Sequence, residues 1–162
     1  MTRLIAIAAA GLGLFLVGAT QVPSQTRLPA PSVVVGAVMT QPFGCTTLEL
    51  EPLDPSCPSR HFHTGIDLAA PAGTLVHSAT SGIAIKGFDP GGAGAFVEVV
   101  VNAHVRVLYC HLSAFAVGSG DAVAPGEVIG LVGATGMATG PHVHLQVDVD
   151  GAPVDPRLFL GS

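Results

Sequence analysis

Charged residues make up only 10% of this 162-residue sequence, and no cluster of basic residues occurs in it. The formal net charge is −5, so the chain lacks the positive surface that nucleic acids require, and we expect no nucleic-acid partner. The scarcity of charge does not indicate disorder, because 49% of the residues are hydrophobic, which is enough to form a core. The length predicts one domain with a small extension.

No sustained apolar repeat of 3.6 residues and helical length occurs in the part of the chain expected to form this domain, which argues against a helical fold. Short runs of Val, Ile and Leu are instead separated by Gly, Pro, Asn and Asp, as in turn-rich β proteins. We expect strands at 33–38, 64–67, 75–78, 82–87, 95–101, 105–112, 127–132 and 142–149. The sequence therefore predicts an all-β fold, a compact and mostly antiparallel sandwich or barrel-like sheet.

The chain has three cysteines and no CxxC pair. Cys45 and Cys57 bracket a Pro-rich segment with little else to order it, so we expect a disulfide between them, worth about 3 kcal/mol in the chain-entropy model. The alternative, that these two cysteines bind zinc, lacks the usual ligand spacing. Cys110 should be a buried free thiol that faces away from Tyr109 and His111, because neighbouring side chains alternate along a strand.

The N-terminus has the pattern of a secretory signal peptide. Arg3 precedes an apolar run over 4–17, and the small residues Gly18 and Ala19 follow. We expect residues 1–19 to be the signal peptide, with an uncleaved membrane anchor as the alternative, 20–32 to be a linker, and 33–162 to be the folded domain. The protein is then predicted to be secreted or held in the cell envelope, outside the cytoplasm, with no membrane contact after cleavage.

Histidines in two motifs suggest a metal site. Residues 141–151 alternate between apolar and polar, so His142 and His144 should emerge on the same face of one strand, roughly 7 Å apart. His63 and Asp67 would lie roughly 13 Å apart on a straight strand, so the chain should bend at Gly65 for both to reach one ion. Two imidazoles and a carboxylate suit Zn²⁺, and three protein ligands leave a fourth position for water, as in catalytic zinc sites.

Several motifs together resemble one known family, the lysostaphin-like zinc endopeptidases of bacterial cell walls. The resemblance covers about 33–160 and is carried, in order, by the segments at 63–74, 109–112, 120–123, 126–130, 133–136 and 140–144. It implies the compact antiparallel β domain of that family, with an active-site groove walled by loops. The loop over 133–140 resembles a phosphate loop in its glycines but lacks the Gly-Lys-Ser/Thr ending, so we expect it to form a groove wall.

The resemblance also implies roles for individual residues. His63, Asp67 and His144 would be the ligands of one Zn²⁺ per chain, and His111 and His142 would be the catalytic histidines beside the metal. The implied activity is that of a secreted zinc metalloendopeptidase, a peptidoglycan hydrolase that cuts peptide cross-links or stems through an activated water. We expect a monomer whose partner is the peptidoglycan peptide.

The chain departs from the family pattern at two places. Gln146 stands where many members have Glu, a difference to which we attach little weight because the position is not an implied ligand. Some members have a tyrosine upstream of the first zinc histidine, whereas Tyr109 is the only tyrosine here. His61 is an alternative ligand but is better explained as a groove-rim residue. We expect His77 to be packed or solvent-facing and His104 to be exposed in a turn.

Two other functions remain open at the level of the sequence. A non-catalytic wall-binding or regulatory domain on the same fold is the first, although no implied ligand is missing. The second is a biotinyl or lipoyl carrier, which the segment 120–130 resembles. A carrier needs a lysine at an exposed turn, and the only lysine, Lys86, lies outside that segment.

Overall fold

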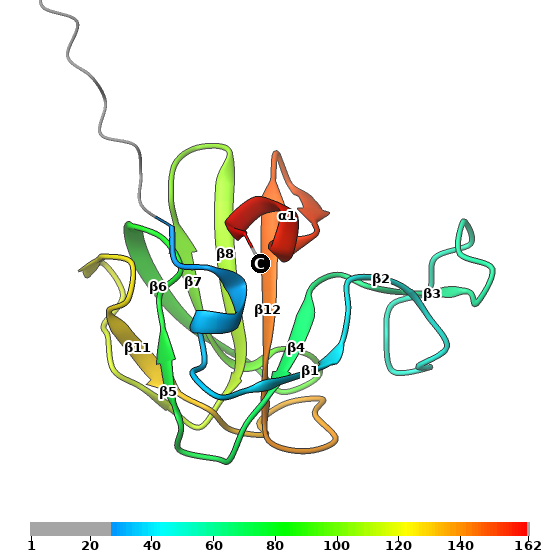
Figure 1. Cartoon of the computed structure of the whole chain (residues 1–162), viewed down its shortest axis with the longest axis horizontal. Helices are drawn as coiled ribbons and strands as arrows, with labels where there is room; N and C mark the ends of the chain where they lie inside the picture. The colour runs from blue at the N-terminus through cyan, green and yellow to red at the C-terminus, as the bar shows by residue number, and fades with distance from the viewer. Residues whose placement is uncertain (1–26, 162) are drawn as a thin grey trace, which may run out of the picture.

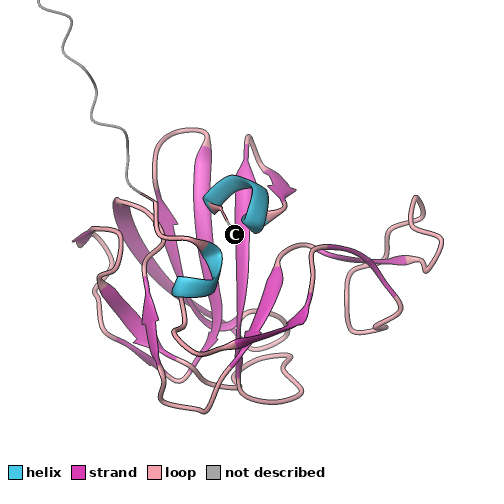
Figure 2. Cartoon of the chain, viewed as in Figure 1, coloured by secondary structure: helices cyan, strands magenta, loops and turns pink. Residues whose placement is uncertain are grey.

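The structure is a computed structural model that describes residues 27–161, so the expected signal peptide lies outside the described residues. Strands dominate it (Figure 2), with only a short 3-10 helix and a single turn of α-helix among the described residues. The strands are β1 (Val38–Gln41), β2 (Gly44–Thr46), β3 (His61–His63), β4 (Ile66–Ala69), β5 (Leu75–His77), β6 (Gly82–Asp89), β7 (Gly94–Val100), β8 (Val105–Leu112), β9 (Ala114–Phe115), β10 (Ala122–Val123), β11 (Val128–Leu131), β12 (His142–Val149) and β13 (Ala152–Val154). The helices are η1 (Ala30–Ser32) and α1 (Pro156–Leu160).

An eight-stranded sheet forms the body of the domain, with β12 near its middle (Figure 1). Its order is β1-β4-β12-β8-β7-β6-β10, and β13 pairs with β12 off this path. A second sheet has the order β5-β11-β9. Every named strand pair in the described part of the chain is antiparallel. The predicted all-β, mostly antiparallel fold is therefore confirmed.

The core lies on one face of this large sheet. Along β12, Val143, Leu145 and Val147 are fully buried, and they join one hydrophobic cluster with Val76 of β5 and Ile129 of β11. The intervening residues of β12 are only partly buried and include both predicted histidines. Because side chains alternate along a strand, burying the apolar set against the second sheet directs the polar set to the opposite face. The alternation predicted for 142–149 is thus confirmed.

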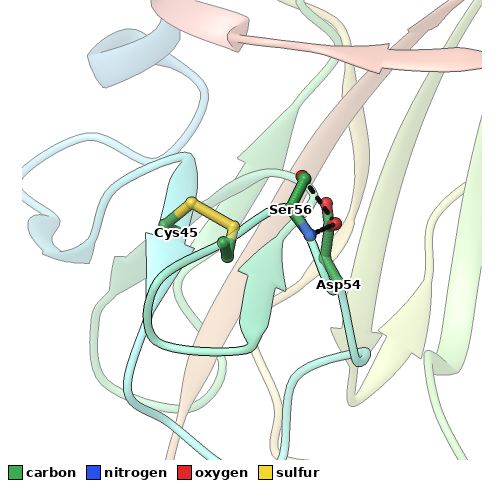
Figure 3. Close-up of a disulfide and its surroundings, with 4 residues drawn as sticks. Cys45, Asp54 and Ser56 are labelled. Atoms are coloured by element: carbon green, nitrogen blue, oxygen red, sulfur yellow. Dashed lines mark hydrogen bonds between the residues drawn. A yellow bond between two sulfur atoms is a disulfide. The ribbon is translucent and has the colours of Figure 1, made fainter.

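The strands β2 and β3 form a separate two-stranded sheet, which projects from the main sheet as an arm (Figure 1). We call residues 44–63 the disulfide arm. Cys45 and Cys57 are joined by a disulfide within it, as predicted (Figure 3). Beside the bond, Asp54 Oδ1 accepts hydrogen bonds from the backbone N–H of Ser56 at 2.8 Å and from its hydroxyl at 2.7 Å. A covalent bond and a local turn therefore order a segment that has little apolar core of its own.

Most strand predictions hold to within about two residues, and one does not. The predicted strand at 33–38 is wrong, because a turn precedes β1 there and the backbone of Gly36 has φ 79°. Val33 and Val34 are nonetheless fully buried, so their apolar character reflects core packing rather than a strand. The predicted strand at 64–67 begins two residues too early, since β3 ends at His63, residues 64 and 65 connect the strands, and β4 runs from Ile66 to Ala69.

Residues that the sequence places in the linker already belong to the packed structure. The backbone N–H of Leu28 donates to the carbonyl of Ala79 at 2.7 Å, and that of Ala30 donates to Gly161 at 3.1 Å. Ala30 is fully buried. We therefore propose that the domain begins near Leu28. None of the helices described between residues 27 and 161 is long and apolar enough to cross a membrane.

Candidate active site

Three predicted metal ligands converge where the disulfide arm meets the main sheet. His63 ends β3, Asp67 lies in β4 and His144 lies in β12. His63 Nε2 lies 2.9 Å from His144 Nδ1 and 3.2 Å from Asp67 Oδ1, and His144 Nδ1 lies 3.1 Å from Asp67 Oδ1. Within residues 27–161 this is the only group of His, Cys, Asp and Glu side chains whose ligand atoms gather closely enough to hold a metal ion.

Strand register and one glycine bring these residues together. Asp67 and His144 lie opposite one another on the paired strands β4 and β12. His63 reaches them because the chain leaves β3, passes Gly65 and turns into β4. A Cβ at Gly65 would collide with the carbonyl oxygen of Leu145 and lie 2.8 Å from His144 Nε2. The sequence predicts a bend at Gly65, and the structure adds that the close approach of β12 leaves no room for a side chain there.

Hydrogen bonds fix which ring nitrogen of each histidine faces the cluster. His63 Nδ1 donates to the carbonyl oxygen of Pro42 at 2.9 Å, which leaves the lone pair on Nε2. His144 Nε2 faces the side-chain oxygen of Gln146 at 3.4 Å, which leaves the lone pair on Nδ1. Both lone pairs therefore belong to the nitrogen atoms that lie beside Asp67.

The separations between donor atoms fit a tetrahedral zinc ion. Zn–N and Zn–O bonds of about 2.0–2.1 Å in a tetrahedron place neighbouring ligand atoms roughly 3.3 Å apart. The observed separations are 2.9, 3.1 and 3.2 Å. Two neutral imidazoles and a carboxylate are also the donor types that Zn²⁺ prefers. The residues present fit the metal that the sequence predicts.

Electrostatics in the cluster favour a charged carboxylate. Burial by itself raises the pKa of Asp67, but His144 and His63 donate to the carboxylate when their rings are protonated, and these contacts outweigh burial and hold the pKa of this carboxyl well below its usual range. Burial likewise lowers the pKa of His63, but the protonated ring can donate to both Asp67 and the carbonyl of Pro42, and these contacts outweigh burial, so that the net pKa is raised. The site therefore presents an anion in a mostly buried position, which is what a cation needs.

The two predicted catalytic histidines lie beside this cluster. The ring centroids of His111 and His142 are 4.6 Å apart, and His142 Nε2 lies 3.8 Å from Asp67 Oδ1. His111 Nδ1 donates to the carbonyl of Thr135 at 2.8 Å, and His142 Nδ1 donates to that of Gly140 at 2.8 Å. Each ring thus keeps its Nε2 free for proton exchange. Burial lowers the pKa of His111, which favours the neutral, proton-accepting imidazole.

An unusual backbone conformation turns His111 toward the site. Its φ is 64°, in the left-handed region that few non-glycine residues adopt. Tyr109 points into the core, where its hydroxyl accepts from the backbone N–H of Ala79 at 2.7 Å, whereas Cys110 and His111 both line the groove. The expectation that Cys110 faces away from His111 is therefore wrong, because the alternation breaks at His111. Cys110 is the buried free thiol that was predicted, and burial raises its pKa to about 12.

A groove of about 690 Å³ runs over the metal cluster. The disulfide arm forms one wall with Leu48, Leu50 and Pro52. The opposite wall includes Met137 and Thr139 from the glycine-rich loop over 133–140, as the sequence predicts. The groove is therefore open enough for an extended chain, with polar side chains around the ligands and apolar side chains such as Leu48, Leu50 and Met137 on its walls.

The other histidines lie outside the cluster. His61 Nδ1 hydrogen-bonds with the backbone oxygen of Glu51 at 2.7 Å, which anchors the disulfide arm instead of binding the ion. His77 is half-buried and lies 3.3 Å from the carbonyl of Val33. His104 is exposed, as predicted, and pairs with Asp150 at 2.6 Å.

The sequence analysis missed one residue at the site, Glu51, and gave little weight to another, Gln146. The carboxylate of Glu51 lies 4.0 Å from His63 Nε2 and lines the groove, but no motif surrounds it, so only folding of the arm reveals it. Gln146 contacts His144 directly. Its signal was available, because Gln146 stands two residues after His144 and must share its face of the strand.

Comparison with known proteins identifies the family. Residues 61–156 match the model of peptidase family M23. The chain is 47% identical over 94 residues to the DD-carboxypeptidase/endopeptidase Mpg of Neisseria meningitidis. The aligned segment is 58% of this chain and 22% of that protein. The chain is also 38% identical over 93 residues to the peptidoglycan DD-endopeptidase ShyA of Vibrio cholerae, covering 57% of this chain and 22% of that protein.

The fold agrees with that assignment. The catalytic domain of the antimicrobial peptidase lysostaphin from Staphylococcus simulans superimposes with a TM-score of 0.64 at 30% identity, over 78% of this chain and 93% of that one. The chain spans about a fifth of the length of the curated relatives named above (22%). The matching segment contains every predicted ligand and both histidines that are predicted to be catalytic, and the chain belongs to peptidase family M23.

Proposed function

We propose that this domain is a zinc metalloendopeptidase that hydrolyses peptide cross-links or stems of peptidoglycan outside the cytoplasm. The observation that carries the proposal is the convergence of His63, Asp67 and His144 under a groove that also contains His111 and His142. The printed names of relatives, a DD-carboxypeptidase/endopeptidase and a peptidoglycan DD-endopeptidase, support the substrate class. One zinc ion per chain follows from the single cluster in the described residues.

His63 Nε2, Asp67 Oδ1 and His144 Nδ1 would hold the ion. When bound, zinc supplies a Lewis acid that polarises the scissile carbonyl and makes a coordinated water more acidic. The protein contributes the geometry. The carbonyl of Pro42 orients the imidazole of His63, and the pairing of β4 with β12 fixes Asp67 against His144. Orientation of ligands by such partners is a large part of the affinity of metal sites.

His111 and His142 would handle the protons. Their Nδ1–H groups are held by backbone carbonyls, so each Nε2 is the atom that can accept a proton from the attacking water or donate one to the leaving amine. A protonated or donating Nε2 can also stabilise the negative oxygen of the tetrahedral intermediate. We propose that the two histidines, whose ring centroids are 4.6 Å apart, share these tasks on the same side of the metal cluster.

The groove suits an extended peptide with small side chains. Its floor is the polar face of β12, and its walls are the disulfide arm and the glycine-rich loop. The glycine-rich loop contributes Gly140 and Thr139, which take little space beside the ligands. Peptidoglycan peptides are short, extended and rich in small residues, so the shape agrees with the proposed substrate.

The proposed location rests on the sequence and on the relatives. An extracytoplasmic substrate requires export, and residues 1–19 have the composition of a signal peptide. We propose cleavage near residue 19 and a monomeric domain thereafter.

The test is fragment release from purified peptidoglycan of several cross-link types, analysed by mass spectrometry. We expect the protein to release muropeptides, a chelator to stop release and added zinc to restore it, and the masses to identify the bond. The matched control is the His111→Ala variant loaded with zinc. Absence of release by folded, zinc-loaded protein from every wall type would contradict the proposal and favour a wall-binding or regulatory domain on the same fold.

A further inference from the structure

Gln146 connects the metal cluster to a chain of polar groups that the proposed chemistry does not use. Its side-chain oxygen lies 3.4 Å from His144 Nε2 and accepts a hydrogen bond from the hydroxyl of Thr64 at 2.6 Å. Its amide nitrogen donates to Asp148 Oδ1 at 2.8 Å. The amide oxygen therefore faces the donors His144 and Thr64, and the amide nitrogen faces a carboxylate, Asp148.

The direction of this amide decides which nitrogen of His144 carries the proton. A neutral imidazole has one N–H and one lone pair. The side-chain oxygen of Gln146 accepts only, so it favours a proton on Nε2 of His144 and leaves the lone pair on Nδ1, beside Asp67 Oδ1. If the amide were reversed, its NH₂ group would face Nε2 and favour the opposite tautomer, which cannot bind an ion at Nδ1.

Asp148 prevents that reversal. A carboxylate accepts hydrogen bonds and donates none, so the NH₂ group of Gln146 must face Asp148, and the oxygen must face His144. The pairing also explains an amide rather than a carboxylate at position 146. A glutamate there would place two like charges about 3 Å apart, which is unfavourable.

We propose that Gln146 is a positioning residue that holds His144 in its metal-binding tautomer, and that Asp148 sets the direction of Gln146. This inference rests on the metal site of the proposed function. It revises the little weight that the sequence gives to position 146. Partners that orient a ligating histidine typically contribute about 10- to 100-fold to metal affinity.

The test compares four variants of the full chain. Gln146→Met keeps the size of the side chain and removes the acceptor. Gln146→Glu combined with Asp148→Asn exchanges the two groups, so that an oxygen still faces His144 and an NH₂ group still links the pair. Asp148→Ala removes only the orienting carboxylate. Asp150→Asn is the matched control, because Asp150 pairs with His104 and not with Gln146.

Two readouts are measured, zinc affinity by competition with a chelator and the tautomer of His144 by ¹⁵N chemical shifts in the metal-free protein. We expect Gln146→Met to weaken zinc binding about 10- to 100-fold and to lose the preference for a proton on Nε2. The exchanged double variant should recover both properties, Asp148→Ala should lose part of each, and Asp150→Asn should lose neither.

Unchanged affinity and tautomer in Gln146→Met would overturn the inference. If that variant did not fold, as judged by its circular dichroism spectrum, then Asp148→Ala would decide, and an unchanged tautomer there would overturn it. Failure of the wild-type protein to bind zinc would instead contradict the proposed function. The tautomer comparison needs no metal, so the two failures remain distinguishable.

Discussion

The main sheet and the disulfide arm supply the same metal cluster by different physical means. Asp67 and His144 sit opposite one another in a ladder of backbone hydrogen bonds, so their separation is set by strand pairing over a buried core. His63 comes from a two-stranded sheet that is held by a disulfide, a turn and the carbonyl of Pro42. The comparison shows that two ligands depend on the core of the domain, whereas the third depends on local restraints of the arm.

The largest effect should come from removing a ligand on the sheet. His144→Ala or Asp67→Ala should abolish stoichiometric zinc binding and all measurable muropeptide release, because two remaining donors do not hold a catalytic zinc ion. Metal content by mass spectrometry and the release assay measure both. Retention of one zinc per chain in either variant would show that the cluster is not the metal site.

The next effect separates ligands from catalytic groups. His111→Ala should lower the rate about 10²- to 10⁴-fold, the usual contribution of a positioned acid or base, with zinc retained. The measurement is turnover on a defined peptide, alongside metal content. Loss of zinc in this variant would place His111 among the ligands and contradict the assigned roles.

A third change acts at the junction between arm and sheet. In Gly65→Ala the new methyl group would overlap Leu145 and His144, so β3 must move away from β12. We expect zinc affinity to fall and the free energy of unfolding to drop by about 1–3 kcal/mol, the usual cost of overpacking. Urea denaturation measures the free energy of unfolding, and chelator competition measures the zinc affinity. Gly73→Ala is the control, because Gly73 has a positive φ but no atom lies within 4 Å of the added methyl group. Equal zinc affinity in both variants would argue against the close approach.

Opening the disulfide tests the arm alone. The double variant Cys45→Ser, Cys57→Ser should lose about 3 kcal/mol of stability in the chain-entropy model, and zinc affinity should fall because His63 is less well held. Hydrogen exchange should increase in residues 44–63 and stay unchanged in β8 and β12. If hydrogen exchange also increased across the main sheet, the arm and the sheet would unfold as one unit. That result would contradict the view that the arm depends on its own local restraints.

The smallest effect is expected in helix α1, which contributes no residue to the metal cluster or the groove. Asp155 caps this helix by accepting from the backbone N–H of Arg157, and the side chain of Arg157 lowers the pKa of Asp155. Asp155→Ala should cost about 1 kcal/mol at neutral pH. Because the folded-state pKa is lowered, the advantage of wild type is present above the unfolded pKa near 4 and is lost as pH falls through the folded value. Denaturation of wild type and Asp155→Ala at pH 7 and below pH 3 measures the difference in their free energy of unfolding at each pH. A difference that does not change with pH would exclude a contribution from the ion pair between Asp155 and Arg157.

Prediction from the sequence succeeds where local pattern and tertiary packing agree. β12 was predicted to its end residues because the alternation of Val143, Leu145 and Val147 with polar residues matches a sheet with one buried face. The segment 33–38 failed because its valines are buried by long-range packing while Gly36 turns the backbone. Short strands such as β9 and β10 have no pattern of their own, since their pairing partners define them.

The same division applies to the site. The spacing of His63, Asp67 and His144, together with a family resemblance, identified the candidate ligands without coordinates. The predicted orientation of Cys110 was wrong, because His111 has a positive φ and its ring is hydrogen-bonded to Thr135, and no sequence pattern indicates either feature. Glu51 and the direction of the Gln146 amide were likewise beyond reach, since both depend on groups that meet only after folding.

By itself the sequence determined the all-β class, the disulfide, the family and the candidate ligand set, because these follow from periodicity, composition and motif spacing along the chain. Only the tertiary structure decided which nitrogen of each imidazole faces the cluster and which residues form the walls of the groove. It also decided that a disulfide and the carbonyl of Pro42 hold His63 in place. Those features arise from contacts between β3, β4, β8 and β12, and such contacts are set by the packing of the whole domain over one core.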